Sequence, residues 1–119
     1  MISVTYYKKE GVIKGFQIQG HAGYACRGKD IVCAAVSSLV LTTVNSLEKF
    51  TDDEKKIFIT EDKAIVIVRF KNAPGHDAKL LIDNMAEGLK SISEEYRSVK
   101  ISVKEEKTHD QDEYTVLRP

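Results

Sequence analysis

The chain has 119 residues with 18 basic and 18 acidic side chains, so its formal net charge at pH 7 is zero. A protein that coats nucleic acid or lies on a membrane surface normally carries a basic excess, and the even balance argues against both classes. No apolar stretch reaches the ~18 residues of a membrane span without a polar interruption, and the first residues lack the pattern of a signal peptide. We therefore expect a single cytoplasmic domain with two reduced cysteines, too few for a disulfide framework.

The first half of the chain reads as a hairpin followed by a long helix. Residues 2–7 and 12–19 alternate apolar and polar side chains, and residues 8–11 supply the turn between two strands. Residues 21–29 have no apolar period and predict a loop. Asp30 is a good N-cap for a helix that closes near Phe50. The expected buried stripe of this helix is Val32, Val36, Leu39, Val40, Thr43, Leu47 and Phe50.

The second half repeats this order loosely. Residues 56–60 and 64–71 predict a second hairpin, and residues 76–96 predict a second helix. The expected buried stripe of that helix is Leu80, Leu81, Met85, Leu89 and Ile92. Alternation over residues 99–103 predicts a last strand. This order indicates an α+β fold, with two long helices on one face of a mainly antiparallel sheet of about five strands. We expect the domain to span residues 1–106, and residues 107–119 to form a charged, disordered tail.

Cys33 is the strongest candidate for a catalytic residue. With Asp30 as N-cap it occupies the third position of the first helix, where unpaired backbone N–H groups and the helix dipole favour a thiolate. His21 lies after Gly20 at a strand end, and the intervening loop could bring it back to the helix start. We predict Cys33 as nucleophile and His21 as general base, then as acid to the leaving amine.

Other residues around this pair are candidates for supporting roles. Asp30 could orient His21 as well as cap the helix, and Ser37, one turn after Cys33, could donate to the thiolate. The first amides of the helix are the nearest donors for an oxyanion. The glycines of the segment would let a substrate backbone approach closely and let the loop close over it. The residues assigned to this substrate loop are Gly23, Tyr24 and Gly28.

Plainer readings of the same residues remain open. Cys33 could be a small buried hydrophobe, and His21 a loop histidine that caps a backbone group. With Cys26 these residues form a His-x4-Cys-x6-Cys set, but structural zinc sites need four ligands, so we expect no metal. The spacing of Cys26 and Cys33 also differs from the Cys-x-x-Cys of thiol oxidoreductases. A binding module without catalysis and a small zinc or redox module are therefore the alternatives.

The same residues resemble the signature of a known family. The run Gly20-His21-Ala22, followed by residues 28–37 (Gly-Lys-Asp-Ile-Val-Cys-Ala-Ala-Val-Ser), is similar to that of Prp, the bacterial ribosomal-processing cysteine proteases. The similarity extends over roughly residues 1–105. It implies that the catalytic cysteine is Cys33 and the catalytic histidine His21, with the associated glycine, aspartate and serine at Gly20, Asp30 and Ser37.

The resemblance also implies a substrate and an assembly. Family members cut a short N-terminal extension from ribosomal large-subunit protein twenty-seven, at a bond preceded by aromatic residues. They are cytoplasmic homodimers that take part in ribosome biogenesis, and a lid between the histidine and the cysteine covers the substrate groove. No cofactor, nucleic acid or membrane is implied. Cys26 is not part of the family pattern.

Overall fold

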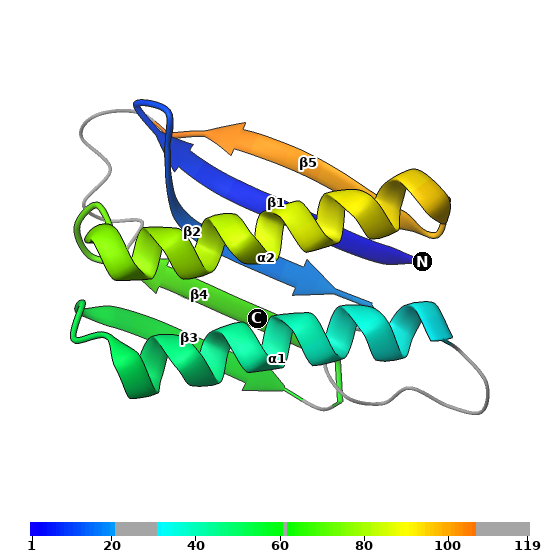
Figure 1. Ribbon diagram of the computed structural model, residues 1–119. Helices are drawn as coiled ribbons and strands as arrows, with labels where there is room; N and C mark the ends of the chain where they lie inside the picture. The colour runs from blue at the N-terminus through cyan, green and yellow to red at the C-terminus, as the bar shows by residue number, and fades with distance from the viewer. Residues whose placement is uncertain (21–30, 61, 107–119) are drawn as a thin grey trace.

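The computed structural model describes residues 1–20, 31–60 and 62–106 of the chain. Their order is strand, strand, helix, strand, strand, helix, strand, as predicted (Figure 1). The elements are β1 (Ile2–Lys9), β2 (Val12–Gln19), α1 (Ile31–Phe50), β3 (Lys55–Thr60), β4 (Ile65–Phe70), α2 (His76–Glu95) and β5 (Val99–Glu105).

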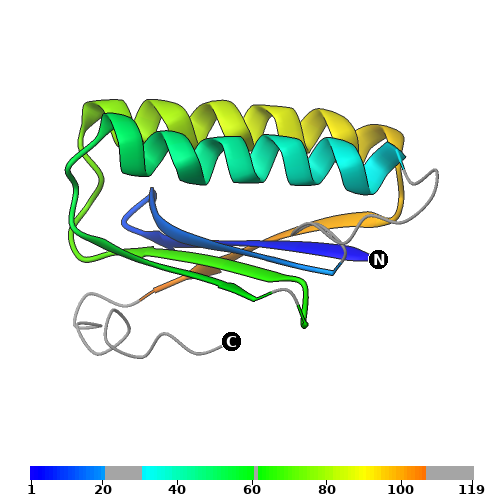
Figure 2. The same cartoon turned by 90° about the horizontal axis from the view of Figure 1, so that it is seen from below.

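The strands form one mixed sheet in the order β3-β4-β2-β1-β5. Three neighbouring pairs are antiparallel, and only β1 and β5 run parallel. Both helices lie on the same face of the sheet (Figure 2). The predicted α+β class, with two helices on a mostly antiparallel sheet, is therefore confirmed. The parallel pair needs a long crossover, and α2 lies in the connection that brings β5 back beside β1.

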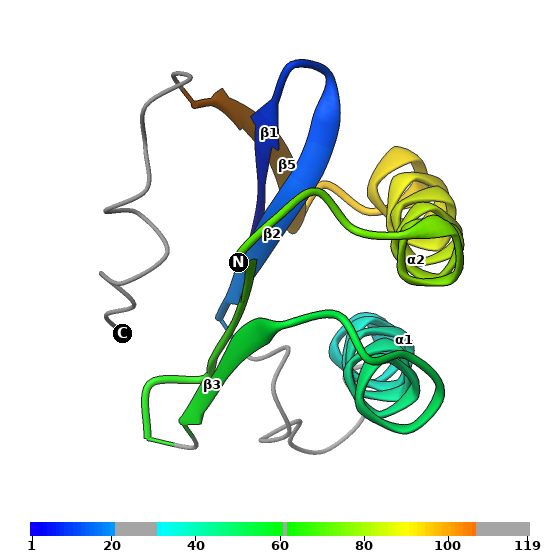
Figure 3. The ribbon, with the colours of Figure 1, turned by 90° about the vertical axis from the view of Figure 1, so that its left-hand side faces the viewer.

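The two strand–strand–helix units exchange their helices. The helix α1 follows β1 and β2 in the chain but lies over β3 and β4, whereas α2 follows β3 and β4 but lies over the β1–β2 hairpin (Figures 1 and 3). Each helix therefore buries its apolar face on strands of the other unit, and neither unit can form a closed core by itself.

The first hairpin turn is set by its sequence. Glu10 and Gly11 both have positive φ, of 53° and 81°, as in the two-residue turns whose twist matches that of paired strands. The register then shifts between Tyr7 and Lys8. Phe16 and Ile18 on β2 point into the core together, and both are fully buried.

The buried stripes of the helices differ in part from the prediction. Phe50 at the end of α1 and Leu80 on α2 are exposed, so their assignment to the core is wrong. Cys33 and Val44 are buried on α1 instead. Each helix packs on the sheet along one side, so an apolar residue about half a turn away stays in water. The buried residues of α2 are Ala78, Ile82, Met85 and Leu89.

Among the described helices, α1 is long and apolar enough to cross a membrane by length and composition. Its packing gives another reason for this composition, since seven of its residues are buried in the protein core. A helix that packs on both a sheet and a second helix needs a broad apolar surface.

Candidate active site

The end of β2 and the start of α1 lie at the same end of the molecule (Figures 1 and 2). Because α1 begins at Ile31, Cys33 is its third residue, the position predicted from the sequence. Backbone N–H groups in the first turn of a helix have no partner within the helix and favour a nearby anion. The element bounds therefore place Cys33 in the first turn of α1.

The sulfur of Cys33 is not available for chemistry in the state that the structure describes. The residue is fully buried within the main hydrophobic cluster, and it is disulfide-bonded. The expectation that both thiols are free is therefore wrong for this state. A thiolate, and not a disulfide sulfur, is the nucleophile in cysteine catalysis, so reduction must precede any attack by Cys33.

Ser37 lies one helical turn after Cys33 and is also buried. Side chains four residues apart on a helix are neighbours on one face. Both therefore lie on the buried side of α1. The proposed donation from Ser37 to the thiolate stays a prediction.

Gly20 fixes the direction in which the chain leaves β2. Its φ is +118°, and its N–H donates to the carbonyl oxygen of Ala64 over 3.0 Å. A Cβ at this position would collide with the carbonyl oxygen of Met1 and lie 3.1 Å from Cα of Ile2. Only glycine fits this backbone and this close approach. The structure thus explains why a glycine occupies position 20, in addition to its predicted place beside the catalytic pair.

The remaining predicted site residues lie outside the described residues. They are His21, Gly23, Tyr24, Gly28 and Asp30, and Cys26 lies there as well. The elements that flank these residues, β2 and α1, end and begin at the same end of the molecule (Figure 1). His21 directly follows Gly20 in the chain.

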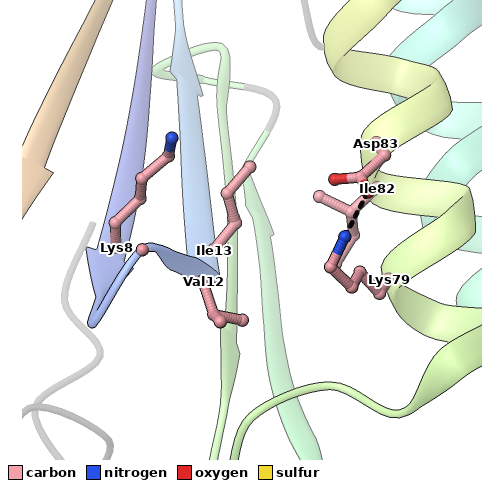
Figure 4. Close-up of a pocket in the computed structure, with 7 residues that line it drawn as sticks. Lys8, Val12, Ile13, Lys79, Ile82 and Asp83 are labelled. Carbon is pink, nitrogen blue, oxygen red and sulfur yellow. Dashed lines mark hydrogen bonds and ion pairs between the residues drawn. The ribbon is translucent and has the colours of Figure 1, made fainter.

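A small cavity of ≈ 80 Å³ lies between the β1–β2 turn and α2 (Figure 4). At its α2 side, Nζ of Lys79 donates to the Asp83 carboxylate over 2.7 Å. Sites for small ligands usually have at least about 300 Å³. This cavity is too small for a peptide, and it lies at the opposite end of the molecule from the start of α1 (Figure 1). Its lining residues are Lys8, Gly11, Val12, Ile13, Lys79, Ile82 and Asp83.

Within residues 1–20, 31–60 and 62–106, no three histidine, cysteine or acidic side chains are grouped as metal ligands. The candidate set from the sequence includes His21 and Cys26, which lie outside these ranges. The chemistry predicted for Cys33 requires no metal, because a cysteine with a general base is itself a sufficient nucleophile.

Comparisons with known proteins identify the family and the fold of the chain. Residues 1–102 match the family described as Cysteine protease Prp. The ribosomal processing cysteine protease Prp of Bacillus subtilis is 32% identical over 89 residues, which cover 71% of this chain and 80% of that protein. The Staphylococcus aureus protein of the same name is 29% identical over 87 residues, covering 73% and 82%.

Two crystal structures of the Staphylococcus aureus protease Prp are also similar in fold. The structure with a covalently linked product peptide has a TM-score of 0.77 and 27% identity, covering 87% of this chain and 100% of that one. The structure with a substrate peptide has a TM-score of 0.73 and 26% identity, covering 89% and 100%.

Proposed function

Because this chain belongs to the Prp family of ribosomal processing cysteine proteases, we propose that it removes the short N-terminal extension of ribosomal large-subunit protein twenty-seven. The observation that carries the proposal is the family match over residues 1–102, which includes α1 with Cys33 in its first turn. Related structures with a substrate peptide and a covalently linked product peptide support a covalent route.

In the proposed reaction, His21 takes the proton of the Cys33 thiol, and the thiolate attacks the carbonyl carbon of the scissile peptide bond. The oxyanion accepts hydrogen bonds from the first amides of α1. His21 then protonates the leaving amine, and the C–N bond breaks to leave a thioester on Cys33. Water, deprotonated by His21, hydrolyses the thioester and releases the carboxylate.

Three residues support the proposed reaction of Cys33 and His21. Asp30 caps α1 and orients His21, so its loss affects both helix stability and turnover. Ser37 donates a hydrogen bond that favours the Cys33 thiolate. Gly20 directly precedes His21 in the chain, and its positive φ sets the direction in which the chain leaves β2.

The loop between the histidine and the cysteine is the proposed substrate-binding segment. Gly23 and Gly28 let the peptide backbone approach, and Tyr24 contributes an aromatic surface for the aromatic residues before the cut. The protein acts as a homodimer in the cytoplasm during ribosome biogenesis. Its partner is the extended ribosomal protein alone, with neither nucleic acid nor membrane.

The test is cleavage of a synthetic peptide that spans the extension and the start of the mature ribosomal protein. The wild type, Cys33→Ala and Thr43→Ala are each incubated with it under reducing conditions, and the products are identified by mass spectrometry. Thr43→Ala is the matched control, because this buried residue of α1 donates its hydroxyl only locally, to the Leu39 carbonyl over 2.8 Å.

A single cut by the wild type and Thr43→Ala, with none by Cys33→Ala, is the expected result. Cleavage by Cys33→Ala would contradict the assignment of the nucleophile. An intact peptide in all three samples, with folding confirmed by circular dichroism, would favour a binding module without catalysis.

A further inference from the structure

The face of the sheet opposite α1 and α2, called here the open face, is buried along β4. The helices cover one face only, and of the elements that the structure describes none lies over the open face (Figures 2 and 3). A strand in such a sheet normally exposes every second residue. Ile65 and Ile67 point to the open face and do not belong to the cluster under the helices, yet they are only 4% and 3% exposed. These two isoleucines need a cover.

The chain itself turns onto the open face directly after β5. The N–H of Glu106 donates to the Lys8 carbonyl over 2.7 Å, and the Glu106 carboxylate pairs with Nη2 of Arg69 over 2.6 Å. The two paired side chains are 9% (Arg69) and 4% (Glu106) exposed. An ion pair this far from water indicates that further chain covers it, because charges are costly to bury in the absence of compensating packing and hydrogen bonds.

Gly15 makes room for this ion pair. In the sheet it lies between Tyr7 and Arg69, and a Cβ on Gly15 would come within 2.8 Å of Cδ of Arg69. The missing side chain lets Arg69 cross β2, so that its guanidinium lies 4.5 Å from the centre of the Tyr7 ring. The crossing directs the positive charge toward β5, where Glu106 begins the last segment of the chain.

We propose that residues 107–119 dock on the open face and cover Ile65 and Ile67 with the apolar run at residues 114–117 (Tyr-Thr-Val-Leu). The length is sufficient. Neighbouring strands are about 4.8 Å apart, so β4 lies roughly 14 Å from β5 across the sheet. Residue 114 is eight residues beyond Glu106, which corresponds to a reach of about 26 Å in an extended chain.

The charges of the two surfaces are complementary. Besides Arg69, which is already paired with Glu106, the open-face positions of the strands include three lysines and no carboxylate. Residues 107–119 carry Asp110, Asp112 and Glu113 against Lys107 and Arg118. The acidic residues precede the apolar run, so they would cross the basic strands before the run reaches β4. A docked segment differs from the disordered tail that the composition of residues 107–119 predicts. The three lysines are Lys56, Lys100 and Lys104.

The direct test is nuclear magnetic resonance on the full chain with labelled isoleucine methyl groups. Nuclear Overhauser effects are expected from the methyls of Ile65 and Ile67 to protons of Tyr114, Val116 or Leu117. Ile82, a buried residue of α2 on the other side of the sheet, is the internal control and should give none. Random-coil shifts for the segment without such effects would overturn the proposal. Effects seen only between differently labelled chains would do so too, because a second copy would then be the cover.

A pair of variants tests the chemistry of the contact. Leu117→Asp places a charge in the apolar run, and Gln111→Asp adds the same charge outside it. Leu117→Asp should shift the Ile65 and Ile67 methyl signals and raise binding of a hydrophobic fluorescent dye several-fold, whereas Gln111→Asp should change neither. Unchanged methyl shifts in Leu117→Asp would contradict docking by this run.

Discussion

The two strand–strand–helix units join their second strand to their helix in different ways. Eleven residues, 20–30, connect β2 to α1 and are called here the first joint. Five residues, 71–75, connect β4 to α2 and are called the second joint. The second joint is tied to the segment before β3 by hydrogen bonds at both of its ends: the Lys71 N–H donates to the Glu54 carbonyl over 3.1 Å, and the Gly75 N–H donates to the Asp53 carboxylate over 2.7 Å. Long connections on a rigid scaffold are where catalytic and binding residues gather. The longer connection, before α1, is therefore the more suitable place for catalytic and binding residues.

The helix starts also differ at equivalent positions. The third residue is Cys33 in α1 and Ala78 in α2, and both are fully buried. The second joint does offer a histidine, His76, but its side chain is 89% exposed and pairs with Asp77 in its own turn. In the sequence, the proposed pair of a cysteine and a histidine, His21 and Cys33, lies at the first of these connections.

The largest expected difference between the joints is in their histidines. His21→Ala should lower kcat/KM for the extension peptide by about 10²–10⁴, because it removes the proposed general base. His76→Ala should change kcat/KM less than twofold. Steady-state cleavage assays measure both, and equal effects of the two substitutions would remove His21 from the mechanism.

The redox state of the first joint should control activity more than any change in the second. Protein purified without reductant should cleave at least tenfold more slowly than after treatment with a dithiol, because Cys33 in a disulfide cannot attack. Cys26→Ser removes the only other cysteine of the chain and should abolish this dependence. Full activity of the wild type under oxidising conditions would contradict the requirement for a free Cys33 thiol.

A third difference lies among the side chains that point from the sheet toward the helices. In one row of paired residues across the strands, the first unit contributes Tyr6 and the second contributes Ile57. Burial raises the pKa of Tyr6 to about 12, and its hydroxyl has no hydrogen-bond partner among the described residues. The unfolded chain loses this proton near pH 10, so the contribution of Tyr6 to stability is complete below pH 10. It then falls by about 1.4 kcal/mol per pH unit toward pH 12.

Tyr6→Phe gives this position the apolar character of Ile57. The variant should therefore lose less stability than the wild type between pH 10 and 12, as measured by urea denaturation. Tyr96→Phe alters an exposed tyrosine and should retain the wild-type pH dependence. Parallel curves for Tyr6→Phe and the wild type would show that the hydroxyl ionises equally in both states.

The smallest expected effect concerns the second joint. Asp53→Ala removes the acceptor of the Gly75 N–H and an anion at the start of α2, and should lower the free energy of unfolding by about 1 kcal/mol. Cleavage by the folded variant should be unchanged, because Asp53 contacts the second joint. A drop in kcat without a loss of stability would show that the two joints are coupled.

Local patterns predicted most of the fold. The alternation of residues 12–19 and the helical period from Val36 to Leu47 each reflect contacts with one buried face, and those elements formed as expected. The exposed positions of Phe50 and Leu80 were missed, because sequence period defines a stripe but not which edge of it meets the sheet. The parallel pairing of β1 with β5 joins opposite ends of the chain, and no local signal specifies it.

The site was predictable to a different extent. The helical position of Cys33 followed from Asp30 and the apolar period after it, both of which are local features. The burial and disulfide of Cys33 depend on what packs against α1 and on redox state, which the spacing of two cysteines does not determine. Gly20 was linked to substrate approach, yet its positive φ and its contact with Met1 arise from strand ends that meet only in the folded sheet.

The central claim is that the reduced Cys33 thiolate attacks a peptide carbonyl, and trapping this residue tests it most directly. The reduced wild type is treated with a peptidyl chloromethyl ketone that ends in aromatic residues, and the adduct is located by tandem mass spectrometry. The account predicts one adduct per chain, on Cys33, with loss of cleavage in proportion to labelling. An adduct on Cys26, or complete labelling of Cys33 with cleavage retained, would contradict it.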